Sequence, residues 1–114
     1  MKKIVIVAPI PGSLINFRGE LIQDIKDKGC EVITVSPPPS EVYSNIFKQK
    51  KIVNIPITFI SNKINLLNDF ICLIKLFRIF RKQSPDVILS YTIKPVIWGG
   101  LASRFLKIDF YALI

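Results

Sequence analysis

Histidine is absent from this sequence and cysteine occurs only twice, and both shortages argue against a metal site. Cys30 and Cys72 stand far apart with no C-x-x-C pairing, so the sequence predicts two reduced, buried thiols and neither a metal nor another cofactor. The apolar run at 4–8 is too short for a signal peptide. The longest apolar segment, 64–80, is interrupted by charged and amide residues and fails as a membrane span.

Familiar phosphate-binding motifs are missing as well. The first loop, 9–16, has Gly12 alone and the next glycine is Gly19, so there is no G-x-G-x-x-G dinucleotide fingerprint and no G-K-[ST] P-loop. No aspartate ends the first apolar run, as a phosphate-accepting receiver domain would require. Three common functions of α/β domains are therefore excluded.

What the chain has in excess is positive charge and apolar residues. Sixteen Lys and Arg against eight Asp and Glu give a net charge of +8, and half of the 114 residues are hydrophobic. This balance predicts one domain with one sizeable core. The charge favours an anionic partner, either a membrane surface or a phosphorylated ligand, while ordinary solubilising charge is the alternative. Nucleic acid is not expected, because the aromatic residues lie in core-like periodic runs.

Strand and helix patterns alternate along the chain. Strands are expected at 3–8, 31–36, 51–57, 86–91 and 109–114, and helices at 14–28, 40–47, from Asn65 through 80, and 95–106. The likeliest linker, 61–63, is short. This alternation predicts an α/β fold, a Rossmann-like doubly wound parallel sheet of about five strands in the order 3-2-1-4-5 within three αβα layers.

Ligands of such sheets bind beyond the carboxyl ends of the strands, where the strand order reverses. Here the crevice would lie between the first loop and the loop at 91–95. Gly12 would let the backbone approach a ligand, and Ser13 and Asn16 stand at a helix start whose free N–H groups attract anions. Alternatively, Gly12 serves only a turn and Ser13 or Asn16 only caps the helix.

The loop at 91–95 concentrates polar groups at a strand-to-helix turn. Thr92 is suited to cap the following helix, Lys94 to bind phosphate, and Pro95 to occupy the first helical turn, with Tyr91 ending the strand before them. A capped turn with a solvated lysine is the equally supported alternative.

The long helix carries a cluster of cations beside aromatic residues. Its basic residues are Lys75, Arg78, Arg81 and Lys82. A basic amphipathic helix can lie on anionic lipid, which would make these residues membrane-facing. The alternative is a core helix whose cations lie near its C-terminal end because the helix dipole favours them there.

Two stretches carry a family resemblance, MKKIVIVAPIPGSLINFRGELI near the start and PDVILSYTIKPVIWGGLASR later. They resemble the N-terminal, acceptor-side domain of GT-B glycosyltransferases of family 4, in the bacterial branch that builds capsule and other cell-envelope polysaccharides. The resemblance covers the whole chain, 1–114. Many family members carry a histidine near the equivalent of Tyr91, which this chain lacks.

The resemblance implies two Rossmann-like domains that face each other across a cleft. The N-terminal one holds the acceptor, often a lipid-linked sugar at the cytoplasmic face of the plasma membrane, and the C-terminal one binds the nucleotide sugar. The first-strand loop would then approach the donor diphosphate and the acceptor, and the second loop would border the reaction centre. These roles would fall to Gly12, Ser13, Asn16, Tyr91, Thr92 and Lys94. No catalytic residue is assigned.

The last predicted strand finishes on apolar residues, 110–114, with no polar tail after it. This ending is typical of the first part of a larger protein, so the chain is expected to lack the donor domain and to be inactive alone. The rival reading is a non-catalytic, membrane-associated subunit that recruits a separate donor-binding chain. In either case the exposed strand is expected to promote self-association, and a cytoplasmic location at the membrane's inner face is expected.

Overall fold

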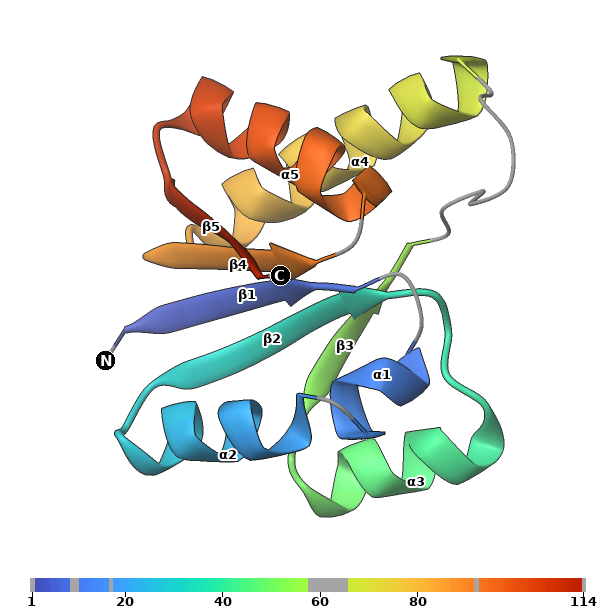
Figure 1. Ribbon diagram of the computed structural model, residues 1–114, viewed down its shortest axis with the longest axis vertical. Helices are drawn as coiled ribbons and strands as arrows, with labels where there is room; N and C mark the ends of the chain where they lie inside the picture. The colour runs from blue at the N-terminus through green and yellow to red at the C-terminus, as the bar shows by residue number, and fades with distance from the viewer. Residues whose placement is uncertain (1, 9–10, 17, 58–65, 92, 114) are drawn as a thin grey trace.

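The computed structural model describes residues 2–8, 11–16, 18–57, 66–91 and 93–113, with the backbone alone at 13, 16, 66, 93 and 94 (Figure 1). The predicted linker at 61–63, the helix cap at Asn65 and Thr92 lie outside the described residues.

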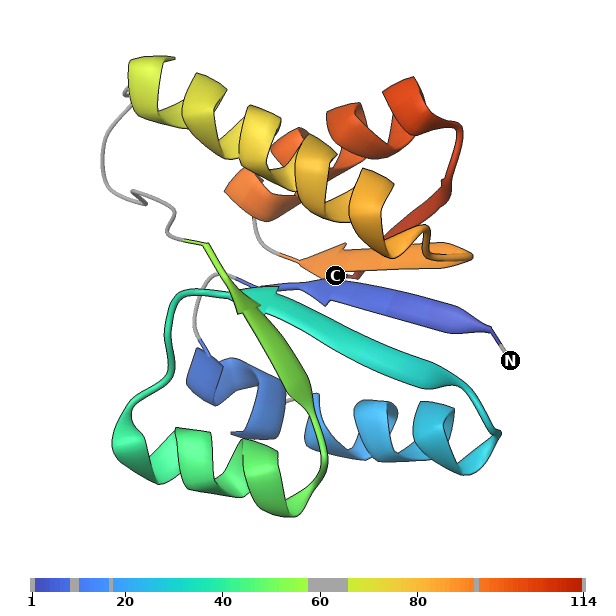
Figure 2. The same cartoon turned by 180° about the vertical axis from the view of Figure 1, so that it is seen from behind.

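Five parallel strands form one sheet in the order β3-β2-β1-β4-β5, which confirms the predicted topology. The strands are β1 Lys3–Val7, β2 Glu31–Ser36, β3 Val53–Pro56, β4 Val87–Tyr91 and β5 Asp109–Leu113. The helices are α1 Pro11–Asn16, α2 Gly19–Asp27, α3 Glu41–Gln49, α4 Leu66–Gln83 and α5 Ile93–Leu106. Helices α1, α2 and α3 cover one face of the sheet, and α4 and α5 cover the other (Figures 1 and 2).

The central strand β1 supplies side chains to two cores. Val5 and Val7 belong to a cluster under α4 and α5, and Ile6 and Ala8 belong to a second cluster with residues of α1, α2 and α3. A continuous Val/Ile run is expected where both faces of a strand are buried, because alternate residues point to opposite faces. The thiol prediction holds for Cys72, which is buried, while Cys30 is half-buried; the two cysteines that the structure describes form no disulfide.

The predicted single helix at 14–28 is two helices. Arg18 has φ −120° and ψ 4°, which is not helical, and it separates α1 from α2. Gly19 follows, and glycine favours helix less than other residues except proline, so a break costs little there. The end of α2 is as predicted: Gly29 has φ +85°, and its N–H donates to the Lys26 carbonyl over 2.9 Å.

Smaller differences lie at the ends of elements. Ser40 stands before α3 as predicted, but its side chain makes no capping hydrogen bond. Strand β3 is shorter than the predicted 51–57, and Lys51 before it has φ 58°, a turn conformation that an extended strand excludes. Helix α5 begins at Ile93, two residues before Pro95, because proline is tolerated within a first helical turn.

Helix α5 packs closely on β5. A Cβ atom added at Gly99 or at Gly100 would lie 3.4 Å from the ring of Phe110. The lack of side chains at these two adjacent glycines therefore lets the Phe110 ring pack against the α5 backbone. Among the helices that the structure describes, none combines the length and apolar character needed to cross a membrane.

Candidate functional site

The two predicted site loops follow neighbouring strands. Strands β1 and β4 are parallel with Val7 opposite Ser90, so both end at the same edge of the sheet. Helix α1 begins at Pro11 and α5 at Ile93, both at that edge. The sheet order reverses between these two strands, which is where ligands of doubly wound sheets bind.

Gly12 makes a close contact that the sequence alone did not indicate. A Cβ atom added at Gly12 would lie 3.0 Å from Cζ and 3.1 Å from the hydroxyl oxygen of Tyr43, a residue of α3. The absence of a side chain at Gly12 therefore admits the Tyr43 ring next to α1. The Tyr43 ring lies on the Cβ side of Gly12, and the ligand contact predicted for the Gly12 backbone stays a prediction.

Tyr91 ends β4 and its side chain is buried in the core cluster on the α1–α3 side of the sheet. The guanidinium carbon of Arg18 lies 4.9 Å from the centroid of the Tyr91 ring. At this distance the cation is attracted to the π face of the ring. Arg18, which follows the first loop, is thereby brought to the end of the second site strand.

The other predicted site residues are only partly placed. The backbones of Ser13, Asn16 and Lys94 lie in α1 and α5 at or near the carboxyl edge of the sheet, while their side chains lie outside the described residues, as does all of Thr92. The ligand contacts predicted for these four side chains stay predictions. Ser90, which precedes Tyr91, has a buried hydroxyl oxygen with no hydrogen-bond partner in the described part of the chain.

Sequence reasoning missed Arg18 and Tyr43. Each was assigned to a helix, and amphipathic periodicity does not tell which helix residue contacts a distant part of the chain. The one available signal was local: Arg18 directly precedes a glycine in the middle of a predicted helix. A helix break at that point places Arg18 outside both helices, so its side chain does not follow the helical periodicity.

The four predicted membrane-facing cations, Lys75, Arg78, Arg81 and Lys82, are all exposed on α4. Two of them border an apolar groove of about 370 Å³ between α4 and α5, lined by Leu73, Ile74, Phe77, Arg78, Arg81 and Phe105. Phe105 is 73% exposed, and Phe70 and Leu101 are exposed as well. Cations and exposed apolar side chains thus share this face.

The parallel sheet and its strand order define a Rossmann-like domain of the kind found in GT-B proteins. Residues 13–112 match the family model described as glycosyl transferase 4-like. The chain belongs to this family, which confirms the identification made from the two sequence stretches. The comparison with curated proteins gives no match.

Solved structures show the same fold at low sequence identity. MurG from Acinetobacter baumannii superposes with a TM-score of 0.76 at 17% identity, over 98% of this chain and 34% of that one. A glycosyltransferase from Rickettsia africae has a TM-score of 0.77 at 18% identity, and the match covers 97% of this chain and 29% of that one. A UDP-GlcNAc 2-epimerase from Methanocaldococcus jannaschii has a TM-score of 0.65 at 19% identity, and the match covers 99% of this chain and 31% of that one.

This chain therefore spans about a third of the length of each of these proteins. Transferases and an epimerase share the fold, so the fold alone does not select an activity. The family model that this chain matches is described as glycosyl transferase 4-like.

Proposed function

We propose that this chain is the acceptor-binding domain of a glycosyltransferase, which moves a sugar from a nucleotide sugar to a lipid-linked or polysaccharide acceptor. The observation that carries this proposal is the match to the glycosyl transferase 4-like family over residues 13–112. The carboxyl ends of β1 and β4 support it, because they form the edge at which ligands of doubly wound sheets bind.

In this proposal the chain supplies one side of the reaction. An acceptor hydroxyl attacks the anomeric carbon of the donor sugar, its proton is lost, and the nucleoside diphosphate leaves. Fixed N–H groups and cations would stabilise the charge on the departing diphosphate. The residues proposed to face the substrates are Gly12, Ser13, Asn16, Tyr91, Thr92 and Lys94. The nucleotide sugar would be held by a further domain or by a partner chain, and this chain would be inactive alone.

The α4–α5 face supports a peripheral membrane location. We define the membrane face as the exposed cations Lys75, Arg78, Arg81, Lys82 and Arg104 with the apolar groove beside them. Cations near an anionic surface and apolar side chains that enter the acyl boundary both favour binding. A lipid-linked acceptor at the inner face of a bacterial plasma membrane, in capsule or other envelope polysaccharide synthesis, would fit such a face.

The first prediction concerns the donor. We expect the isolated chain to bind uridine and guanosine diphosphate sugars weakly or not at all, because the proposal places the donor site on another domain. Isothermal titration calorimetry with a panel of these sugars measures it. Micromolar affinity for one of them would contradict the proposed division of the site.

A second candidate function is a non-catalytic subunit that recruits a separate donor-binding chain to the membrane. The exposed apolar residues of the membrane face favour an interaction role of this kind. A neighbouring reading frame that encodes a nucleotide-sugar-binding domain would support this candidate. A single interrupted frame would support a truncated enzyme instead.

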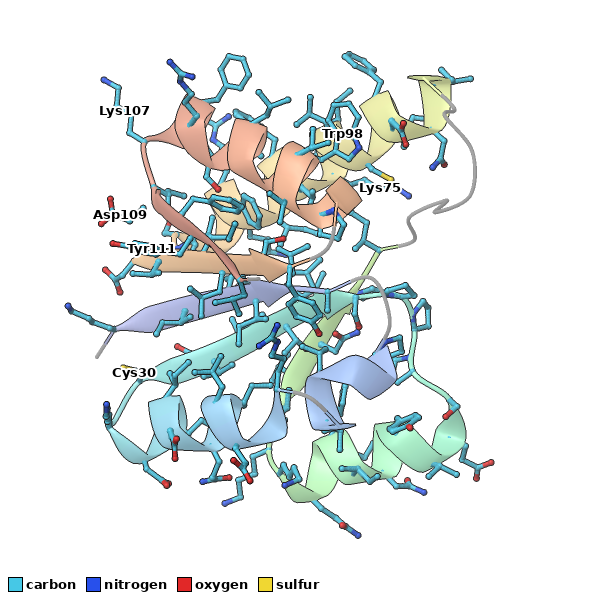
Figure 3. The ribbon with its side chains drawn as sticks, in the orientation of Figure 1. Cys30, Lys75, Trp98, Lys107, Asp109 and Tyr111 are labelled. Atoms are coloured by element: carbon cyan, nitrogen blue, oxygen red, sulfur yellow. The ribbon has the colours of Figure 1, made fainter. Side chains whose placement is uncertain are left out.

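The second prediction concerns self-association. Strand β5 is one edge of the sheet, and Tyr111 on it is 57% exposed and points away from the sheet (Figure 3). Exposed edge strands pair with other chains, so we expect a concentration-dependent dimer that Tyr111→Lys weakens. Light scattering over a concentration series measures this.

The opposite edge provides the control for that experiment. Val53 on β3 is 61% exposed, but β3 also carries Pro56, which has no N–H group to donate. Val53→Lys should therefore leave the dimer unchanged. A wild-type chain that stays monomeric at high concentration would contradict the prediction.

A further inference from the structure

Arg18 occupies an unusual position between the two helices of the first helical segment. Its carbonyl accepts a hydrogen bond from the Ile22 N–H over 2.9 Å, which fixes its backbone at the start of α2. Its half-buried side chain extends to the ring of Tyr91, 4.9 Å from the guanidinium carbon. The cation is therefore held in one place by both its backbone and its side-chain contact.

One donor of this guanidinium is left without an acceptor. The Nε atom of Arg18 is buried and, among the residues that the structure describes, has no hydrogen-bond partner. Within the part of the chain that the structure describes, no carboxylate forms an ion pair with Arg18. A buried N–H group without an acceptor is unfavourable, because it has given up water without a replacement.

Stacking explains only part of the arrangement. A guanidinium presents its flat face to an aromatic ring, while its five N–H groups lie in its plane and point away from the ring. The contact with Tyr91 thus orients the Arg18 guanidinium and leaves the N–H groups at its edge available to a hydrogen-bond acceptor. The groups that best match two parallel N–H donors are carboxylate and phosphate.

The location places this cation at the candidate site, and the proposed function selects phosphate from these two anions. Tyr91 is the last residue of β4, beside β1 at the reversal of strand order. We propose that Arg18 binds the phosphate of a diphosphate-bearing ligand at this edge of the sheet, oriented by the Tyr91 ring. The inference rests on the proposed function for the source of the ligand, which is either the diphosphate of a lipid-linked acceptor or that of the nucleotide donor.

The main test measures binding of three probes, inorganic pyrophosphate, geranyl diphosphate and UDP, by calorimetry. Arg18→Lys keeps the charge but removes the paired, planar donors, so we expect at least about a tenfold weaker affinity for the probes that bind. Lys28→Arg, at the exposed end of α2 and outside both proposed binding surfaces, is the matched control for the reverse exchange and should bind as the wild type does. Tighter binding of geranyl diphosphate assigns the site to the acceptor, and tighter binding of UDP assigns it to the donor.

A second measurement needs no variant and so does not depend on how Arg18→Lys folds. Phenylglyoxal modification of the wild-type chain, followed by mass spectrometry, reports each arginine separately. Pyrophosphate should slow modification of Arg18 and leave Arg78 and Arg104 unchanged. No protection of Arg18, or equal affinity of Arg18→Lys and the wild type, would overturn the inference.

These outcomes are distinct from failure of the proposed function. Pyrophosphate binding through Arg18 is measured without any sugar donor or transfer reaction. Micromolar binding of nucleotide sugars by this chain would refute the division of the site and leave the Arg18 result intact. Conversely, absence of Arg18-dependent binding refutes this inference and leaves the acceptor role of the chain standing.

Discussion

Phe80→Ala is expected to lower the free energy of unfolding by about 3–5 kcal/mol, the largest change among the substitutions considered. Phe80 lies on α4, is 0% exposed, and belongs to the core cluster that joins α4 to β1 and β4. Removing its ring leaves a cavity that close-packed neighbours fill only in part. Because domains of this size are stable by about 5–15 kcal/mol, the loss is a large fraction of the total.

Phe105→Ala provides the matched control, since it removes the same ring from the neighbouring helix. Phe105 is 73% exposed, and substitutions at exposed positions usually change stability by less than about 0.5 kcal/mol. Urea unfolding followed by circular dichroism gives both values. Similar losses for the two variants would show that α4 and α5 do not pack on the sheet as described.

The second large effect is expected at the membrane face. We expect the triple variant Arg78→Glu, Arg81→Glu, Arg104→Glu to lose at least about a hundredfold in affinity for vesicles that contain anionic lipid. Each cation near such a surface contributes about 1 kcal/mol, and reversal adds repulsion to that loss. Wild-type binding should also fall as salt is added, because surface charges are screened. Co-sedimentation with liposomes measures both effects.

The opposite side of the molecule supplies a control with the same change in net charge. Lys28, Lys48 and Lys50 are exposed at the ends of α2 and α3, across the sheet from α4 and α5 (Figure 1). Replacing these three by glutamate should weaken binding much less than the first triple variant. Equal losses would show that net charge alone drives binding, and equal wild-type binding to neutral vesicles would remove the electrostatic role altogether.

The sheet was predictable because its pattern is local and strong. Buried parallel strands are continuous apolar runs, so β1 and β2 are recognised directly, and alternation with helices then leaves few topologies. Breaks within helices were less predictable. The break between α1 and α2 falls at Arg18, and the following Gly19 is its one local signal. The contact between Arg18 and Tyr91 joins residues far apart in the chain, so no helical pattern predicts it.

The candidate site was predictable in location and not in contacts. Topology brings the loops after β1 and β4 to one edge, whichever side chains they carry. Which atoms meet there depends on the packing of α3, and that packing puts Tyr43 against Gly12. The groove between α4 and α5 is likewise a result of tertiary packing, since the sequence predicts each helix but not which residues of the two lie together.

The measurement that tests the central claim most directly is an amide NMR titration of the isotope-labelled chain with a short-chain isoprenyl diphosphate sugar, an analogue of a lipid-linked acceptor. Acceptor binding at the carboxyl edge predicts that the shifts concentrate around Gly12, Arg18 and Tyr91. Shifts confined to the hollow between α3 and β3, around Ser44 and Asn54, or no shifts at all, would contradict the assignment of this chain as the acceptor-binding domain.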